Sequence, residues 1–397
     1  MSKPMTAERT AGTVVTFDGA PKPGFINFGV GQPSADLLSV DLVRTASELF
    51  FADAQPLELN YGERQGDARF LASLSRLLES EYGKAAPPGS LMVTAGNSHA
   101  LDFVCNRFTR PGDTVFVEDP SYFLAFRIFR DHGLNIVGIP VDDDGLNVDR
   151  LEQELERHRP VLLYTIPSYH NPTGVTMSRE RRERLVALSL IHDFIIAADE
   201  VYQMLYYGDP PPPALGTYTE QGNVLSLGSF SKILAPAMRL GWIQTDAGHM
   251  ETLVASGTVN SGGSFNQYTS HIVRQAIDEG LLADSMRHLR AQLGARVRAM
   301  DGALREHLGD LLDWHCPQGG YFFWLKLRGQ VDANRLREHA DDFRTGFQAG
   351  NLFTPRGDGL QNYIRLSFAH YNEAYIEEGV QRVASLIRRH AGKGMGR

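Results

Sequence analysis

The chain has 397 residues, of which 42% are hydrophobic and 22% charged, proportions typical of a globular protein with a large core. Its 39 basic and 47 acidic side chains give a formal net charge of -8, which argues against nucleic acid or an anionic membrane as the main partner. No stretch approaches the roughly 20 apolar residues that span a bilayer, and residues 1–15 lack the apolar core of a signal peptide. The two cysteines, Cys105 and Cys316, stand in no CxxC or metal-ligand spacing, so we expect a cytoplasmic protein.

Short β-branched runs alternate with amphipathic stretches from about Leu91 to Asp246. The expected strands are 91–96 (LMVTAG), 114–120 (TVFVEDP), 135–141 (NIVGIPV), 161–168 (VLLYTIPS), 194–202 (FIIAADEVY), 223–231 (NVLSLGSFS) and 239–245 (RLGWIQT). Strands that are apolar nearly throughout and separated by helices are typical of a mostly parallel sheet covered on both faces. We therefore predict an α/β domain with a seven-stranded sheet sandwiched by helices.

A Gly/Ser-rich loop at residues 261–267 precedes a long amphipathic helix. Steps of three and four place its apolar residues on one stripe: Leu282, Met286, Leu289, Leu293, Val297, Met300, Leu304 and Leu308. The helix is expected to connect the sheet domain to a second domain, which contains the strand-like runs 319–327 and 362–368 and a final helix at 373–390.

Polar side chains cluster where the predicted strands end. They are Gly96, Asn97 and Ser98 after the first strand, His170 and Asn171 after the fourth, Asp199 and Tyr202 in the fifth, and Ser229, Ser231 and Lys232 in the sixth. In open α/β sheets, ligands bind outside the carboxyl ends of the strands. We therefore expect these clusters to form one site.

Each cluster allows a functional and a structural interpretation. Gly96 to Ser98 open a helix whose free N–H groups suit a phosphate, although a plain N-cap is the commoner explanation for such a short piece. A carboxylate at Asp199 is costly near the sheet unless it pairs with a cation or a protonated ring nitrogen, and a structural ion pair would also satisfy it. Tyr202 could donate a hydrogen bond to a ligand or simply pack.

Lys232 follows an apolar strand and lies seven residues before Arg239. A lysine beside buried apolar surface can have a lowered pKa and attack a carbonyl to form a Schiff base. Arg239, with Ser229 and Ser231, offers charge-assisted bonds to a phosphate. Most lysines are solvated, but the neighbouring strand-end clusters favour the functional interpretation here. The stretch GVGQPS (29–34) lacks the third glycine of a dinucleotide fingerprint, and neither a P-loop nor HExxH is present, so no nucleotide or metal site is expected.

Taken in order, several stretches resemble fold type I pyridoxal-phosphate enzymes, specifically the class I/II aminotransferases and the branch that includes 2-aminoadipate and kynurenine aminotransferases. The motifs are LNYGERQGDARFLASL, TAGNSHAL, VEDPSYF, PSYHNPTG, ADEVY, SFSKILAPAMRLGW and YIRLSF. The resemblance implies the aspartate aminotransferase fold, in which a smaller α+β domain is built from both chain ends. The implied division is 1–45 for the N-terminal segment and cap, 46–280 for the large cofactor-binding domain, and 281–397 for the connector helix and small domain.

The resemblance also implies roles for the residues at matching positions. Lys232 would hold pyridoxal 5'-phosphate as a Schiff base and move the proton between the substrate Cα and the cofactor, while Asp199 would keep the pyridine nitrogen protonated. Tyr202 and Asn171 would bond the phenolic oxygen, and Tyr122 would stack on the ring. The phosphate would be held by Gly96, Asn97, Ser98, Ser229, Ser231 and Arg239.

Two further implications concern the substrate and the partner subunit. Arg365, in YIRLSF, would clamp the substrate α-carboxylate with Asn171 and the backbone of Gly31. Tyr61, in LNYG, would reach the phosphate of the neighbouring subunit, so a homodimer with shared active sites is expected. Two positions depart from the family pattern. His170 stands where glutamine is frequent, and we expect it to pack beside the site; Ala237 replaces a usual glycine, which puts the local turn in question.

We predict an aminotransferase that acts on an α-amino acid and on a 2-oxo acid such as 2-oxoglutarate or pyruvate. Leu37 and Leu38 favour an aliphatic or aromatic side chain, whereas Arg44 could meet the distal carboxylate of a 2-aminoadipate-like substrate. Two alternatives remain. One is another reaction on the same cofactor, such as C–S lysis, cyclisation or decarboxylation. The other is a cofactor-sensing regulator, which we disfavour because only about 25 residues precede FINFGVG.

Overall fold

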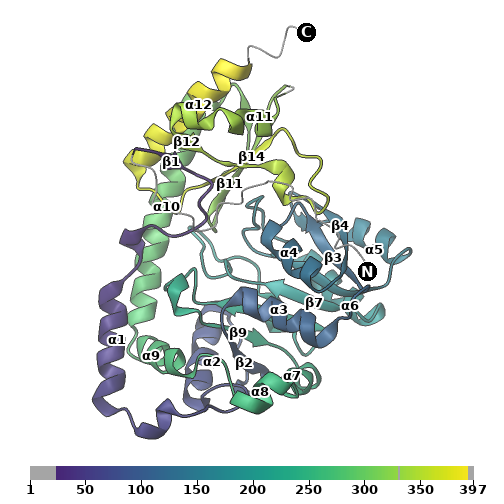
Figure 1. The fold of residues 1–397 in the computed structure, drawn as a ribbon, viewed down its shortest axis with the longest axis vertical. Helices are drawn as coiled ribbons and strands as arrows, with labels where there is room; N and C mark the ends of the chain where they lie inside the picture. The colour runs from purple at the N-terminus through teal and green to yellow at the C-terminus, as the bar shows by residue number, and fades with distance from the viewer. Residues whose placement is uncertain (1–23, 330, 392–397) are drawn as a thin grey trace, which may run out of the picture.

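The computed structural model describes residues 24–329 and 331–391, and its centre is one twisted eight-stranded sheet (Figure 1). The strand order is β2-β9-β8-β7-β6-β3-β4-β5. The bounds are β2 (Leu91–Thr94), β3 (Thr114–Asp119), β4 (Asn135–Asp142), β5 (Gly145–Leu146), β6 (Pro160–Thr165), β7 (Ile195–Asp199), β8 (Val224–Ser229) and β9 (Gly241–Gln244). All seven expected strands are present, and the predicted α/β fold is confirmed.

The sheet is mostly parallel, as its apolar strands predict. Neighbouring strands from β4 to β8 run parallel, while β9 runs antiparallel to both β8 and β2. The eighth strand, β5, forms a short antiparallel hairpin with the end of β4. Sequence reasoning missed it because its two residues follow three aspartates and carry no strand-length apolar pattern.

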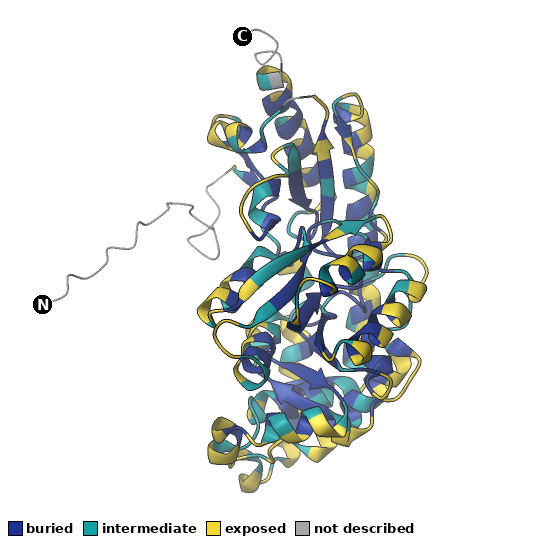
Figure 2. Cartoon of the chain, turned by 90° about the vertical axis from the view of Figure 1, so that its right-hand side faces the viewer, coloured by how far each residue is buried: buried dark blue, intermediate teal, exposed yellow. Residues whose placement is uncertain are grey.

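Helices cover both faces of this sheet, and Figure 2 shows most of its strands buried, whereas β4, near one edge, is partly exposed. A core cluster that includes Phe116, Leu151 and Leu185 covers one face, and alternate residues such as Val115 belong to the larger cluster on the other. The helices in this part of the chain are α1 (Val40–Asp53), α2 (Ala68–Tyr82), α3 (Asn97–Phe108), α4 (Phe123–Asp131), α5 (Val148–Leu155), α6 (Arg179–Ile191), α7 (Ala247–Val254), α8 (Gly257–Gly262) and α9 (Gln267–Asp278). Short 3-10 turns include η1 (Ala35–Leu37), η2 (Pro56–Leu59), η5 (Pro236–Met238) and η7 (Gly350–Phe353).

The predicted connector is α10 (Leu281–Leu308), a helix of 28 residues. All eight apolar residues of the predicted stripe are buried in it. Figure 1 shows α10 running from the side of the large sheet up to α12 (Glu373–Ala391), against which it packs. Because every third or fourth residue is apolar, one face of α10 packs into the hydrophobic core of both the large domain and the small domain.

The small domain joins segments from both ends of the chain. Its antiparallel sheet has the order β10-β11-β14-β13, and β1 (Ile26–Asn27) pairs in parallel with β12 (Thr345–Gly346). The remaining elements are β10 (Leu312–Asp313), β11 (Phe322–Leu327), α11 (Ala333–Glu338), β13 (Gln348–Ala349) and β14 (Tyr363–Ser367). The domain boundaries remain predictions: the one after residue 45 falls inside α1, and the one after residue 280 coincides with the start of α10. Residues 1–23, including the stretch judged for a signal peptide, lie outside the described residues.

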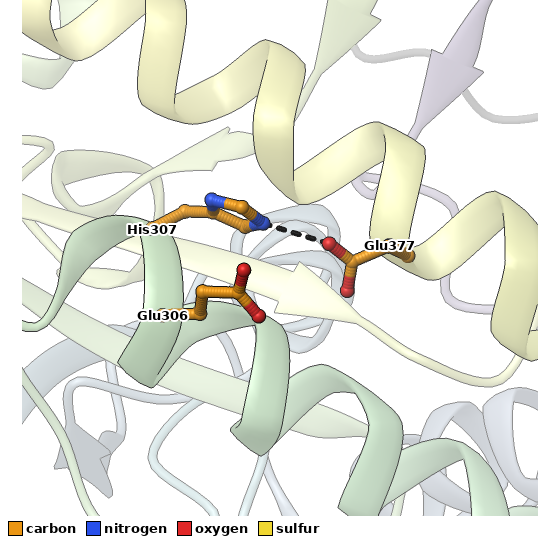
Figure 3. A group of neighbouring side chains, drawn as sticks. All are labelled: Glu306, His307 and Glu377. Carbon is orange, nitrogen blue, oxygen red and sulfur yellow. Dashed lines mark hydrogen bonds and ion pairs between the residues drawn. The ribbon is translucent and has the colours of Figure 1, made fainter.

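Polar contacts tie α10 to α12 on the outside of the small domain (Figure 3). His307 Nε2 lies 2.7 Å from Glu377 Oε1, and the carboxylate of Glu306 projects beside the pair. Arg388 donates to the backbone oxygen of His307 at 2.9 Å and pairs with Asp310. We assign this cluster to helix packing. None of the described helices is both long and apolar enough to cross a membrane.

Candidate functional site

A cavity of about 650 Å³ lies at the carboxyl ends of the large-sheet strands and is closed on its other side by the small domain. This is the edge at which the strand-end clusters were expected to meet. Twelve of the predicted site residues line it: Gly31, Asn97, Ser98, Tyr122, Asn171, Asp199, Tyr202, Ser229, Ser231, Lys232, Arg239 and Arg365. Segments up to 334 residues apart in the chain, from Gly31 to Arg365, therefore meet in one place.

Lys232 follows β8 and directs its amine into this cavity. Its Nζ donates to the carbonyl oxygen of Gly31 at 3.0 Å and lies 5.0 Å from the centre of the Tyr321 ring. Burial and then the nearby Arg365 guanidinium lower the pKa of Lys232 to about 8, while Asp199 opposes the shift. A substantial neutral fraction near physiological pH makes this amine a competent nucleophile.

Asp199 ends β7 and accepts hydrogen bonds from two side chains and from the backbone N–H of Val201, the last at 3.4 Å. Its Oδ1 accepts from Asn97 Nδ2 at 2.6 Å and its Oδ2 accepts from the Tyr164 hydroxyl at 2.7 Å. Burial raises the pKa of Asp199, and these hydrogen bonds and the Lys232 ammonium oppose that shift. The carboxylate is thus fixed in orientation within the cavity, as pairing with a protonated ring nitrogen requires.

The structure refines the role expected for Asn97. Its side-chain amide donates to Asp199 at 2.6 Å and to the Leu227 carbonyl oxygen at 3.3 Å, so it also orients the carboxylate, while its expected phosphate contact stays a prediction. Sequence reasoning missed another donor to Asp199, Tyr164. This residue lies within the apolar strand β6, where the sequence pattern is that of a core residue. Its function depends on the pairing of β6 with β7, which no local pattern encodes.

The expected phosphate site lies at the start of α3. Gly96 is the N-cap residue with a φ of 84°, and a Cβ there would stand 2.7 Å from Arg239 Nη2. Gly96 therefore shapes the site, although it does not line the cavity. Ser229 Oγ and Ser231 Oγ lie 2.9 Å apart, and Arg239 Nη2 donates to the Ala95 carbonyl oxygen at 3.0 Å. Hydroxyls, a guanidinium and a helix N-terminus together suit a dianionic group.

Ala237 fits the turn that precedes Arg239. It lies within η5, and the left-handed backbone of this turn falls instead on Arg239, with a φ of 45°. Since Ala237 itself needs no positive φ, alanine is accommodated where the family pattern usually has glycine.

Arg365 in β14 is a second buried cation, at 4% exposure. Its Nη1 donates to Asn171 Oδ1 at 2.9 Å, and its Nη2 donates to the Gly29 carbonyl oxygen at 3.0 Å. The guanidinium lies 4.0 Å from the centre of the Phe322 ring. Burial lowers the pKa of Arg365 to about 10, so it stays charged at neutral pH. Held on three sides, the planar cation is oriented to receive a carboxylate.

Two tyrosines supply neutral hydroxyl donors to the same cavity. Tyr122 lies at the N-cap of α4, and burial raises its pKa to about 12. Tyr202 is 4% exposed, packs against the Tyr321 and Phe322 rings, and has its pKa raised by burial. Both hydroxyls remain protonated at physiological pH, as donors to a phenolate oxygen would need to be.

Some of the singled-out residues lie elsewhere. Tyr61 is 84% exposed and outside the cavity lining, so its expected contact with a neighbouring subunit stays a prediction. Arg44 pairs with Asp41 at the surface, and neither Leu37 nor Leu38 lines the cavity. His170 is buried but faces away from the lining, toward Glu118.

The cavity lining also contains residues that sequence reasoning did not single out. They include Phe25, Asn27, Phe123, Leu124, Ile128, Gln348, His370 and Tyr371. They come from the N-terminal segment, α4 and the small domain, which meet only after the two domains pack. Gln348, for instance, is opposite Arg365 in the β13–β14 pair. A local motif could not have identified them.

Comparison with known proteins decides the family. A family model described as aminotransferase class I and II matches residues 23–383. The chain belongs to this family. The motif-based resemblance is therefore confirmed, as are the aminotransferase assignment and the pyridoxal-phosphate cofactor that this family uses.

Individual members of the class I and II aminotransferases are similar over nearly their full length. Aromatic-amino-acid aminotransferase 1 of Thermococcus litoralis is 32% identical over 369 residues, covering 91% of this chain and 88% of the relative. A kynurenine aminotransferase structure from Pyrococcus horikoshii, complexed with PMP, has a TM-score of 0.86 at 30% identity and covers 92% of this chain and 91% of its own. An α-aminoadipate aminotransferase structure from Thermus thermophilus has a TM-score of 0.84 at 27% identity over 94% of both chains.

The chain is also similar to a protein of a different description, which it matches over only part of that protein's length. The Bacillus subtilis protein YdfD, described as an uncharacterized HTH-type transcriptional regulator, is 27% identical over 369 residues. The match covers 93% of this chain and 75% of YdfD. Likeness to the family therefore establishes the fold, the cofactor and the aminotransferase assignment, while the substrates have to be argued from the site.

The residues of this aminotransferase fit pyridoxal phosphate. The buried Asp199 carboxylate suits a ring nitrogen, and the Lys232 amine suits the aldehyde carbon. The glycine cradle at Gly96, which a Cβ would fill, leaves room for the phosphate beside Arg239. These residues therefore supply an amine that can bind the cofactor covalently, and groups of opposite charge for its ring nitrogen and its phosphate.

Proposed function

We propose that this aminotransferase transfers the α-amino group of an amino acid with an aliphatic or aromatic side chain to a 2-oxo acid such as 2-oxoglutarate or pyruvate. The observation that carries the proposal is the arrangement of Lys232, Asp199 and Arg365 around one cavity. It supplies a nucleophilic amine, a fixed carboxylate and a carboxylate-binding cation. Transamination needs all three.

Each residue has a defined task in this reaction. Pyridoxal phosphate supplies the electron sink that stabilises negative charge on the substrate Cα. Arg365 binds the substrate α-carboxylate, and Asn171, hydrogen-bonded to it, fixes its orientation. Lys232 Nζ anchors the cofactor and, once the substrate amine has displaced it, accepts the proton from the substrate Cα. Asn97 and Tyr164 fix the Asp199 carboxylate, which would pair with the ring nitrogen of the bound cofactor.

The part of the cavity lining outside the predicted contacts with the cofactor and the α-carboxylate supports a substrate with an uncharged side chain. Phe123, Leu124 and Ile128 contribute apolar surface to the cavity. Among the described lining residues, the lysine and arginines are Lys232, Arg239 and Arg365, and each already has a task. Burial lowers the pKa of His370, so its ring is neutral at physiological pH. A distal carboxylate therefore meets no permanent cation in this part of the lining, which favours neutral over 2-aminoadipate-like donors.

We also propose that the active unit is a homodimer. Several large apolar side chains are exposed on α1, η2, α9 and the loop after η2: Phe51, Leu57, Leu59, Tyr61 and Tyr268. A cluster of this kind is typical of a subunit interface. Tyr61 would then reach the phosphate site of the partner. Light scattering should give twice the chain mass, and Tyr61→Ala should weaken cofactor binding without unfolding the protein.

The decisive experiment is a panel of amino donors tested with 2-oxoglutarate and with pyruvate. We expect a 2-oxo acid and a new amino acid to form in equal amounts, with aliphatic or aromatic donors preferred, and Lys232→Ala to abolish both turnover and the borohydride-reducible cofactor band. Release of ammonia, thiol or carbon dioxide without amino transfer would instead support the other reactions of this cofactor. Absence of turnover with every donor would refute an aminotransferase.

A further inference from the structure

A buried carboxylate lies behind the active site and outside its lining. Glu118, in β3, is 1% exposed. Its Oε1 accepts from the Thr165 hydroxyl at 2.7 Å and its Oε2 accepts from the Ile166 backbone N–H at 2.7 Å. The same Oε2 lies 3.1 Å from His170 Nε2. Glu118 thus binds the end of β6 and the loop that follows it.

His170 connects this carboxylate to the loop that carries Asn171. Its ring is buried, with Nε2 toward Glu118 and Nδ1 2.8 Å from Thr173 Oγ1. Its backbone N–H donates to the Val175 carbonyl oxygen at 2.8 Å, and its own carbonyl oxygen accepts from Gly174 at 2.7 Å. The ring and backbone together close the turn from residue 170 to residue 175.

Asn171, the next residue, connects this turn to the proposed active site. It is 5% exposed and lines the cavity, and its Oδ1 accepts from Arg365. With Oδ1 committed to Arg365, its Nδ2 is the group that can donate to a ligand. Asn171 lies on a loop, so no strand or helix fixes the direction of its side chain. The ring of the preceding residue, His170, is held at Nδ1 by Thr173, and its Nε2 lies 3.1 Å from Glu118 Oε2, so these contacts restrain the loop that carries Asn171.

We propose that Glu118 and His170 form a positioning pair that holds Asn171, and through it Arg365, in the geometry that binds the substrate α-carboxylate. The inference rests on the proposed function, because it assigns a task to residues behind the same site. It also explains why histidine can replace the glutamine frequent in this family. Both side chains can present an N–H to Glu118 while filling similar space.

The test compares two substitutions at one position. His170→Gln keeps a side-chain N–H that can reach Glu118, whereas His170→Leu removes it at similar volume. Loss of a close polar contact to a buried charged group corresponds to roughly a tenfold change in binding. We expect His170→Leu to raise the KM for the amino donor about tenfold with a smaller change in kcat, and His170→Gln to stay within about twofold of the original enzyme.

A second readout separates positioning from general stability. Because Asn171 is expected to donate to the ring oxygen of the bound cofactor, the pH midpoint of the cofactor's visible band should shift in His170→Leu and return in His170→Gln. Thermal unfolding of each variant reports any loss of stability separately. Should His170→Leu fail to fold, Thr173→Val removes the other anchor of the ring more gently and should give an intermediate KM and midpoint.

The outcomes distinguish this inference from the proposed function. If the unaltered protein has a cofactor band but no transamination, the proposed function fails. If it transaminates normally and the folded His170→Leu or Thr173→Val variants keep the original KM and band midpoint, the positioning pair is refuted. Equal damage in His170→Leu and His170→Gln would also refute it, since only the first removes the N–H.

Discussion

The pKa of Lys232 offers the sharpest test of the site. Burial and the Arg365 guanidinium together lower it to about 8, against an opposing effect of Asp199. At pH 7 the amine is then about 9% neutral, compared with about 0.03% for a lysine of ordinary pKa near 10.5. The reactive form is therefore enriched roughly 300-fold.

Competitive acylation of the cofactor-free protein measures this directly. The chain contains only six lysines, so mass spectrometry resolves each one. Lys326 is exposed on β11 and serves as the internal reference. The labelling rate of Lys232 should rise with pH and level off above about 8, because the neutral form reacts.

Two substitutions give shifts of opposite sign. Arg365→Leu removes a positive neighbour, so the labelling midpoint of Lys232 should move up. Asp199→Asn removes a negative neighbour at nearly constant shape, so the midpoint should move down. A midpoint in the unaltered protein above pH 10, or shifts with the same sign in both variants, would refute this electrostatic account.

Three further predictions concern neighbouring residues. Arg365→Lys keeps a charge but loses the two-sided hydrogen bonding to Asn171 and Gly29, so kcat/KM for amino donors should fall roughly 30-fold or more, measured in steady state. Tyr164→Phe removes a donor to the buried Asp199 carboxylate and should lower the free energy of unfolding by about 1.5–3 kcal/mol in urea titrations. Gly96→Ala places a Cβ against Arg239 at a backbone position with a positive φ. Cofactor affinity, measured by fluorescence titration, should therefore fall about tenfold, and an unchanged affinity would refute the role of Gly96 in shaping the phosphate site.

The sequence singled out polar residues that stand where apolar strands end. Lys232, Asp199 and Asn171 stand at or after the ends of apolar strands, and the expected convergence of these strand ends on one edge of the sheet marked them as a candidate site. The strands themselves were predictable because every residue of β7 and of β8 is buried, and their sequences are nearly continuous apolar runs.

Residues whose chemistry depends on strand pairing or domain packing were missed. Tyr164 is an ordinary aromatic residue in β6, and only the pairing of β6 with β7 brings its hydroxyl to Asp199. Glu118 was quoted within a motif, but its contact with His170 spans 52 residues and crosses from β3 to the loop after β6. The role of Asn97 was likewise incomplete, because the side chain it contacts lies 102 residues away.

The charges around Lys232 also connect substrate binding to proton transfer. Before the substrate binds, Arg365 faces the amine uncompensated and helps to keep it neutral. A bound α-carboxylate neutralises the Arg365 charge, and removing that field raises the basicity of the amine at the stage when it must accept a proton from Cα. In the proposed reaction Arg365 therefore acts twice. Unpaired, it favours the neutral, nucleophilic amine of Lys232; paired with the substrate carboxylate, it allows that amine to act as a base. Addition of a simple monocarboxylate to the cofactor-free protein should accordingly raise the labelling midpoint of Lys232, and the same addition should leave the midpoint unchanged in Arg365→Leu.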